Sequence, residues 1–170
     1  MSNQKNYKPL LTFHNAAIER NGNRILDIAD CRLNLGEHVA IIGPNGSGKS
    51  TLLKLLTAEI HALHRSQPPV TLFGETTWTL ADIRSRIGFV SQDIQTLYLR
   101  ECTGRTVILS GFFGSIDLYQ TPSAEQIRSA ENIARRLGIT QLLDRTIDTM
   151  STGEARRCLI GRALVFNPDI

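Results

Sequence analysis

Gly43-Pro44-Asn45-Gly46-Ser47-Gly48-Lys49-Ser50-Thr51 is the stretch that decides the fold, because it matches the phosphate-binding pattern G-x-x-x-x-G-K-[ST] at every fixed position. The apolar run His38–Ile42 before it is rich in β-branched residues and predicts a buried parallel strand. The leucine-rich segment 52–56 after it predicts a helix, since neither Gly nor Pro interrupts it. This context of strand, loop and helix favours a phosphate-binding loop over a glycine-rich turn that only joins two elements.

The chemistry that this loop indicates is the binding of a nucleoside triphosphate. Gly46 and Gly48 let the backbone curl without a Cβ in the way, so that amides at the start of the helix can point at an anion. Lys49 is expected to reach the β- and γ-phosphates, and the Ser50 hydroxyl is expected to ligate Mg²⁺. The whole candidate loop consists of Gly43, Pro44, Asn45, Gly46, Ser47, Gly48, Lys49, Ser50 and Thr51.

Composition argues against several other classes of protein. The 170 residues are 41% hydrophobic and 21% charged, which is ordinary for one soluble globular domain. No apolar run approaches the roughly 18 residues that cross a bilayer, and the polar first residues do not resemble a secretory signal. A net charge of +3 argues only weakly for a nucleic-acid partner. Cys31, Cys102 and Cys158 are odd in number and far apart, which predicts reduced thiols in a cytosolic protein.

The N-terminal half predicts a small antiparallel sheet beside an α/β core. Within Leu10–Leu35, Asn21-Gly22 separates two apolar segments and is typical of a hairpin turn. Further along, Val70–Phe73 predicts a short strand, Leu80–Arg86 a short helix, and Ile87–Ser91 a strand that leads into Gln92.

The C-terminal half predicts helices. Ser123 and Gln126 fit a capping box, and the helix that follows is expected to stop at Gly138. A second helix is expected from about Glu154 to Val165. The predicted fold class is therefore α/β, with a P-loop NTPase core, an N-terminal antiparallel β subdomain and a helical subdomain.

Two further features allow a functional and a structural interpretation. His61 and His64 could grip a metal from one helical face, but no Cys or carboxylate follows at ligand spacing, so solvated histidines at a helix end are the expectation. Phe112, Phe113 and Tyr119 lie beside glycines and could form an exposed patch that docks a partner, although filling the core of the helical subdomain is favoured.

A second motif narrows the family. Met150-Ser151-Thr152-Gly153-Glu154 is followed by a helical segment and resembles the signature motif of ATP-binding cassette (ABC) proteins, usually written L-S-G-G-Q. Ser151 and Gly153 match this motif, and Glu154 replaces its Gln. By itself the segment could be an ordinary helix N-cap, but Ser151 lies 102 residues after Lys49, a separation typical of such cassettes.

Gln92 resembles the glutamine of the family's Q-loop, because it follows a short predicted strand. In the family this residue touches Mg²⁺ and the attacking water, which makes Gln92 the candidate catalytic residue and, with Ser50, a candidate metal ligand. The resemblance further implies that the cofactors are ATP and Mg²⁺. One ATP would be enclosed between the phosphate loop of one protomer and Ser151, Gly153 and Glu154 of the other.

The chain departs from the family pattern at two places. Arg20 stands where family members commonly stack an aromatic residue on adenine, and a guanidinium can also stack on a π-face. The segment Asn167–Ile170 resembles the lead-in to the Walker B strand, whose closing Asp-Glu pair is not in the sequence. We therefore expect the chain to be part of a longer protein, and the 170 residues alone to be inactive as an ATPase.

The resemblance implies a single, partial ABC ATP-binding domain over residues 1–170. Residues from about 10 to 95 would form the β and core part with the phosphate loop, and residues from about 100 to 165 the helical subdomain with the signature helix. The stretch Ile108–Tyr119 is similar to the branch labelled as ATPase components of molybdenum transport or photorepair.

The implied function is ATP hydrolysis in a homodimer or cassette dimer that drives transport. The implied partner is a membrane permease, and the implied location is the cytoplasm, at the cytoplasmic face of the membrane. The alternatives are a soluble ABC-type ATPase that acts on nucleic acid or the ribosome, and a nucleotide-binding fragment without catalysis. The lack of a basic stripe disfavours nucleic acid without excluding it.

Overall fold

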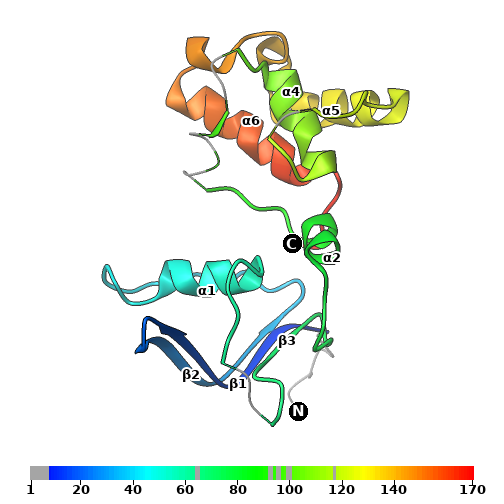
Figure 1. The fold of residues 1–170 in the computed structure, drawn as a ribbon. Helices are drawn as coiled ribbons and strands as arrows, with labels where there is room; N and C mark the ends of the chain where they lie inside the picture. The colour runs from blue at the N-terminus through cyan, green and yellow to red at the C-terminus, as the bar shows by residue number, and fades with distance from the viewer. Residues whose placement is uncertain (1–7, 64–65, 92–93, 95–96, 99–100, 117) are drawn as a thin grey trace, which may run out of the picture. The chain divides into compact units, whose positions relative to one another are not determined.

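A computed structural model describes residues 8–63, 66–91, 94, 97–98, 101–116 and 118–170 (Figure 1). The chain divides into two compact units, residues 1–83 with Ile170 and residues 84–169. The first unit carries the phosphate-binding loop and the second carries the signature segment.

The sheet of the first unit is a long antiparallel hairpin with a third strand beside it. Strand β1 spans Pro9–Arg20, β2 spans Asn23–Asn34 and β3 spans Val70–Leu72, in the order β2-β1-β3. Asn21 and Gly22 join β1 to β2 with φ angles of 53° and 76°, the left-handed conformation that a two-residue hairpin turn requires. The predicted hairpin and the strand near Val70 are confirmed.

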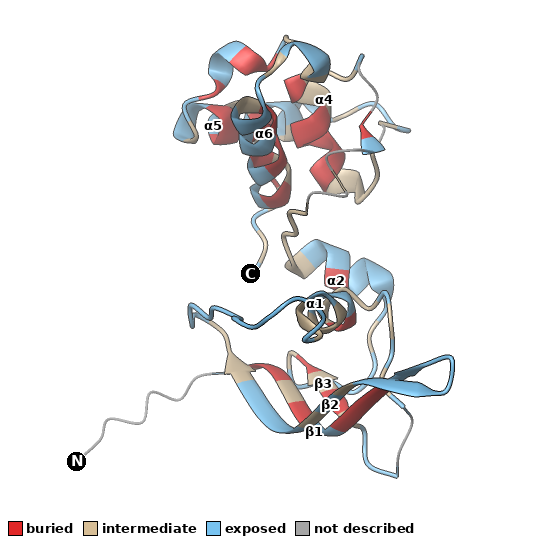
Figure 2. Ribbon diagram, turned by 90° about the vertical axis from the view of Figure 1, so that its left-hand side faces the viewer, coloured by how far each residue is buried: buried red, intermediate tan, exposed pale blue. Residues whose placement is uncertain are grey.

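The central strand β1 supplies most of this unit's core (Figure 2). Its buried side chains include Leu11, Phe13 and Ala17, each at most 1% exposed. Helix α1, Lys49–Leu56, contributes Leu55 to the buried set, as the apolar run after the loop predicts. In both ribbon views α1 lies over the sheet (Figures 1 and 2).

The prediction of strands at His38–Ile42 and Ile87–Ser91 is wrong for this structure. Both segments are irregular, and Ile42 is 92% exposed. The strands that the structure describes pair only antiparallel, in the one sheet around β1. A parallel strand is stable only when neighbouring strands accept and donate its backbone hydrogen bonds, and neither segment has such a neighbour among the described residues.

The second unit is helical. Helix α2, Leu80–Arg86, begins in the first unit and ends in the second. The further helices of the second unit are α4 Gly104–Leu109, α5 Ala124–Arg136 and α6 Thr152–Leu164. Its 3-10 turns are η1 Ser110–Phe113, η2 Thr140–Leu142 and η3 Ile147–Thr149. The predicted helices at Leu80–Arg86, after Ser123 and up to Val165 are confirmed within about two residues at each end. Gly138, at φ 63°, follows the end of α5 as expected.

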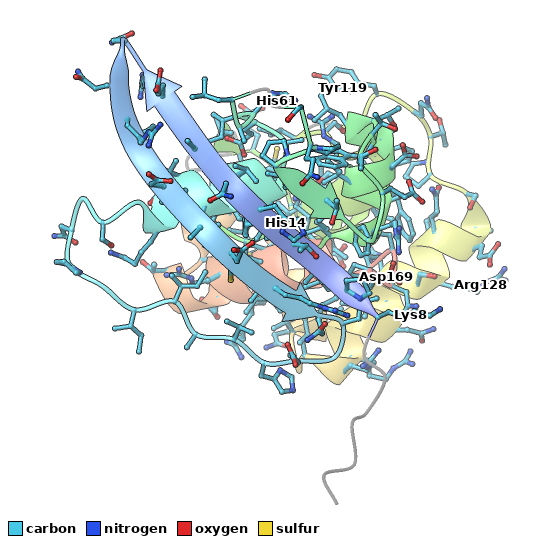
Figure 3. All side chains as sticks on the ribbon, turned by 90° about the horizontal axis from the view of Figure 1, so that it is seen from below. Lys8, His14, His61, Tyr119, Arg128 and Asp169 are labelled. Carbon is cyan, nitrogen blue, oxygen red and sulfur yellow. The ribbon has the colours of Figure 1, made fainter. Side chains whose placement is uncertain are left out.

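Helix α4 and the 3-10 turn after it pack closely against α6 around a buried core. This core includes Val107, Ile108, Cys158 and Leu159. Phe112 is half-buried against the same core, in line with the structural interpretation of that residue, whereas Tyr119 is 81% exposed (Figure 3).

Gly111 marks the closest approach between η1 and α6, and replacing it with alanine is expected to destabilise the protein. A Cβ at this position would overlap the carbonyl oxygen of Arg162 and lie 2.8 Å from Cγ1 of Val165. Overpacking of a close-packed core costs about 1–3 kcal/mol or more, so the denaturant midpoint should fall measurably. Gly153→Ala is the matched control, because a Cβ there meets nothing within 4 Å. Equal midpoints for the two variants would contradict this packing argument.

Candidate nucleotide-binding site

The phosphate-binding loop turns sharply before α1. Gly46 and Gly48 have φ angles of 82° and 88°, a region that side chains with a Cβ rarely adopt. The amide of Ser47 donates to the carbonyl oxygen of Pro44 at 3.3 Å and closes the turn. Gly48 is the N-cap of α1, and no side chain caps this helix. The first amides of α1 are therefore available to an anion.

The Lys49 ammonium group folds back over the loop that precedes it. Its Nζ donates to the carbonyl oxygens of Gly43 at 2.9 Å and Pro44 at 2.7 Å, and lies 3.5 Å from Oγ of Ser47. The same loop therefore gathers a cation and the start of a helix, two groups that both favour a bound phosphate.

The loop packs on the hairpin through Gly48. A Cβ at Gly48 would lie 2.8 Å from Cδ1 of Leu26 and 3.7 Å from the carbonyl oxygen of Ile25. Leu26 pairs with Ile18 and Asn23 pairs with Arg20, so the hairpin end that carries Arg20 is the end that supports the loop. The motif pattern does not reveal Leu26 as a support, because this contact joins segments that are distant in sequence.

The signature residues gather at the start of α6. Ser151 is the N-cap, and its Oγ accepts from the Glu154 amide at 3.3 Å. In return, Oε2 of Glu154 accepts from the Ser151 amide at 2.8 Å and from the Ser151 hydroxyl at 2.9 Å. These bonds lower the pKa of the Glu154 carboxyl, with the Ser151 amide as the largest cause and the nearby Arg145 as a smaller one. Gly153 lies between Ser151 and Glu154 in the sequence, and a Cβ at this position would meet no atom within 4 Å.

Arg145 belongs to this segment but lies outside the signature motif. Its Nη1 donates to Oε1 of Glu154 at 3.2 Å, and its Nη2 donates to the carbonyl oxygen of Thr149. The only signal in the sequence is indirect: Glu154 stands where the resembling motif has a neutral Gln, and a carboxylate favours a cationic neighbour.

The remaining candidate residues are placed as follows. Gln92 and His64 lie outside the described residues. His61 is exposed in an irregular segment after α1, so the expected helical setting of this histidine is wrong (Figure 3). No group of three or more metal-ligating side chains occurs in the described part of the chain. Cys31, Cys102 and Cys158 form no disulfide bond with one another.

A cavity of about 410 Å³ lies in the first unit, away from the phosphate loop. Its lining includes Leu55, Pro68, Val70 and Trp78, and none of the residues 43–51. Residues 43–47 of the loop are exposed, and this cavity is not part of the nucleotide-binding candidate. Across the described ranges, no helix combines the length and the apolar character that a membrane crossing needs.

Comparison with known proteins gives a consistent family. The chain is 39% identical over 170 residues to the ABC transporter ATP-binding protein ModF of Escherichia coli, across 96% of this chain and 34% of that protein. It is 31% identical over 166 residues to the zinc uptake system ATP-binding protein ZurA of Listeria monocytogenes, across 96% of this chain and 62% of that protein.

Solved structures share the fold. MJ1267, an ATP-binding cassette of an ABC transporter crystallised in its ADP conformation, superposes with a TM-score of 0.75 at 26% identity, covering 94% of this chain and 66% of that one. CbiO1 of Clostridium perfringens superposes with a TM-score of 0.77 at 23% identity, covering 95% of this chain and 63% of that one.

The chain spans between about a third and three-fifths of the length of these curated relatives. Residues 26–170 match the family described as ABC transporter. This range includes the phosphate loop and the signature segment. With the glycine loop before α1 and the capped signature turn before α6, the chain belongs to the ABC transporter family.

Proposed function

We propose that the chain is the ATP-binding part of an ABC system, whose complete protein binds MgATP and hydrolyses it in a head-to-tail dimer to drive transport. The observation that carries the proposal is the loop at residues 43–51. There Gly46 and Gly48 are in left-handed conformations, and no side chain caps the start of α1. The Lys49 ammonium group donates to the carbonyl oxygen of Pro44 in the turn. These three features together suit a triphosphate.

The two candidate groups have complementary roles in this proposal. Lys49 and the first amides of α1 bind the phosphates on one protomer, and Ser151 and Gly153 bind the same ATP from the other protomer. Splitting the site between two chains makes hydrolysis depend on dimer formation, since phosphoryl transfer needs positioned charge more than covalent catalysis. Arg20, at the hairpin end that supports the loop, stacks on the base.

The residues present also fit a magnesium ion. Ser50 is exposed in the first turn of α1 and offers a hydroxyl oxygen, the kind of ligand that Mg²⁺ prefers. Mg²⁺ would neutralise charge between the β- and γ-phosphates when bound. Gln92 is proposed as a second ligand that also orients the attacking water.

The proposed partner is a membrane permease, bound at the cytoplasmic face of the membrane. Support comes from the similar proteins, whose names describe ATP-binding proteins of transport systems such as zinc uptake. The dimer could pair two copies of the chain or two cassettes within one longer polypeptide. The match to only 34% of ModF leaves room for the second arrangement.

A complementation experiment tests the shared site. In the protein encoded by the complete reading frame, Lys49→Ala and Gly153→Asp should each abolish ATP turnover. Mixing the two inactive proteins should restore turnover, because one of the two sites in a mixed dimer then combines an intact loop with an intact signature turn. Phosphate release measures the rate, and each variant mixed with itself is the control.

The outcomes separate the alternatives. If the mixture stays inactive although each variant still associates with the wild type, two separate chains do not share the site. Turnover that survives Lys49→Ala would contradict the proposed function itself.

A further inference from the structure

The start of α6 carries an ion pair that helix capping does not require. The chain contains a second capping box at the start of α5, where Ser123 is the N-cap and Oε1 of Gln126 accepts from the Ser123 amide at 2.8 Å. The box at α6 has the same reciprocal pattern, with Glu154 in place of Gln126. A neutral side chain therefore suffices to cap a helix in this protein, so capping alone does not explain the negative charge of Glu154.

The negative charge of Glu154 provides an ion-pair partner for Arg145. One carboxylate oxygen of Glu154 closes the capping box, and the other accepts from Nη1 of Arg145 at 3.2 Å. The Arg145 side chain is 41% exposed and that of Glu154 is 25% exposed, so solvent screens this partly buried pair less than it screens a fully exposed one. The second arm of the same guanidinium reaches the carbonyl oxygen of Thr149. Arg145 thus holds both ends of the turn that presents Ser151.

The backbone around Arg145 is itself fixed to the start of α4. The Gly104 amide donates to the carbonyl oxygen of Arg145 at 3.0 Å, and the Ile147 amide donates to that of Cys102 at 2.9 Å. The guanidinium is therefore anchored at its base as well as at its tip. A planar group with two donating arms is suited to fix a turn in this way, and a lysine cannot reproduce the two-armed geometry.

We propose that Arg145 is a positioning residue that holds the Thr149–Ser151 turn, and hence the Ser151 hydroxyl and the first amides of α6, in the arrangement that meets ATP. This inference rests on the proposed function, because it assigns the signature turn to the nucleotide. Arg145 acts through Glu154 and Thr149 and does not itself touch the phosphates.

Steady-state kinetics in the protein encoded by the complete reading frame tests this role. If Arg145→Ala leaves the turn correctly placed only about a tenth of the time, the KM for ATP rises about tenfold while kcat changes little, since saturating ATP selects the ordered turn. Arg145→Lys keeps the charge but loses the second arm, so its KM should fall between those of wild type and Arg145→Ala.

Arg105→Ala is the matched control. Arg105 lies in the same helical unit, and its guanidinium pairs with Glu131 at 3.1 Å and Asp144 at 3.2 Å rather than with Thr149 or Glu154. Its loss removes a guanidinium with two carboxylate partners and should leave the KM unchanged. A merely structural role for Arg145 would instead make both variants alike.

Two further measurements keep the test independent of protein stability. Amide hydrogen exchange without nucleotide should be faster by about tenfold at residues 149–154 in Arg145→Ala, and unchanged there in Arg105→Ala. In a Glu154→Gln background, where the capping box can close as it does at Gln126, Arg145→Ala should have a smaller effect on KM than in the wild type.

The failures are distinguishable. A wild-type protein that does not hydrolyse ATP would contradict the proposed function, and this inference with it. A wild type that hydrolyses ATP, with equal KM values for Arg145→Ala and Arg105→Ala and equal exchange at residues 149–154, would overturn the role of Arg145 alone.

Discussion

Replacing Lys49 with alanine is expected to reduce MgATP affinity by roughly 10²-fold or more, which is the scale of losing one partner of a desolvated charge pair. The ammonium group is held over the loop by the carbonyl oxygens of Gly43 and Pro44, so its charge already lies at the loop that is proposed to bind the phosphates. Its removal takes away both the charge and the two hydrogen bonds that hold it there. Titration with a fluorescent ATP analogue measures the effect.

Lys54→Ala provides the control for this substitution. Lys54 lies in the last turn of the same helix α1, at the end away from the loop, and carries the same charge. Its loss should change affinity little, because exposed charges at a distance are screened by salt. If both lysine variants bind the analogue as the wild type does, the loop is not the nucleotide site. If both lose affinity equally, the effect is one of overall charge.

The sequence predicts best those features that are decided by neighbouring residues. Asn21-Gly22 forms the hairpin turn because these two residues tolerate left-handed backbone angles at little cost. The predicted capping box at Ser123 forms because Gln126 lies three residues along the chain, and the N-cap at Ser151 forms with Glu154 at the same spacing. In each case all the residues that form the turn or the cap lie within four consecutive positions of the sequence.

Features that depend on distant residues are not predicted in the same way. The composition of His38–Ile42 suits a strand, but a strand exists only when a neighbour pairs with it, and sequence composition does not provide the neighbour. The support of Gly48 by Leu26 likewise joins two segments that no local pattern connects. Arg145 escapes prediction for another reason: its partners lie four and nine residues along the chain, across the 3-10 turn η3, and no helix or strand periodicity connects them.

The site predictions are unequal in their support. The loop residues 43–51 and the Ser151–Glu154 group each form a compact arrangement, in separate units of the structure. The roles of Gln92 in water activation and of Arg20 in base stacking stay predictions. Both depend on the nucleotide itself, which the complementation experiment and the Lys49 titration address first.

Residues 1–170 by themselves are expected to hydrolyse ATP at or near the background rate, although they bind it. They contain Lys49 and Ser50, which bind phosphate and metal, but no Asp-Glu pair at the end of an apolar run. General-base help of that kind is typically worth about 10²–10⁴-fold. The protein encoded by the complete reading frame should therefore turn over ATP faster by a factor in that range, as phosphate release from equal concentrations of the two proteins would show.

The irregular segment before the phosphate loop gives this comparison a second measurement. Ile42 is 92% exposed and Val39 is 52% exposed, so residues 1–170 display apolar side chains that a neighbouring strand would cover. Pairing of this segment in the complete protein should slow hydrogen exchange at residues 38–42, whose amides lack strand partners in the described structure. The Lys49→Ala variant of the complete protein controls for contaminating ATPases. A Lys49-dependent rate in residues 1–170 equal to that of the complete protein would mean that a carboxylate within these residues activates the water.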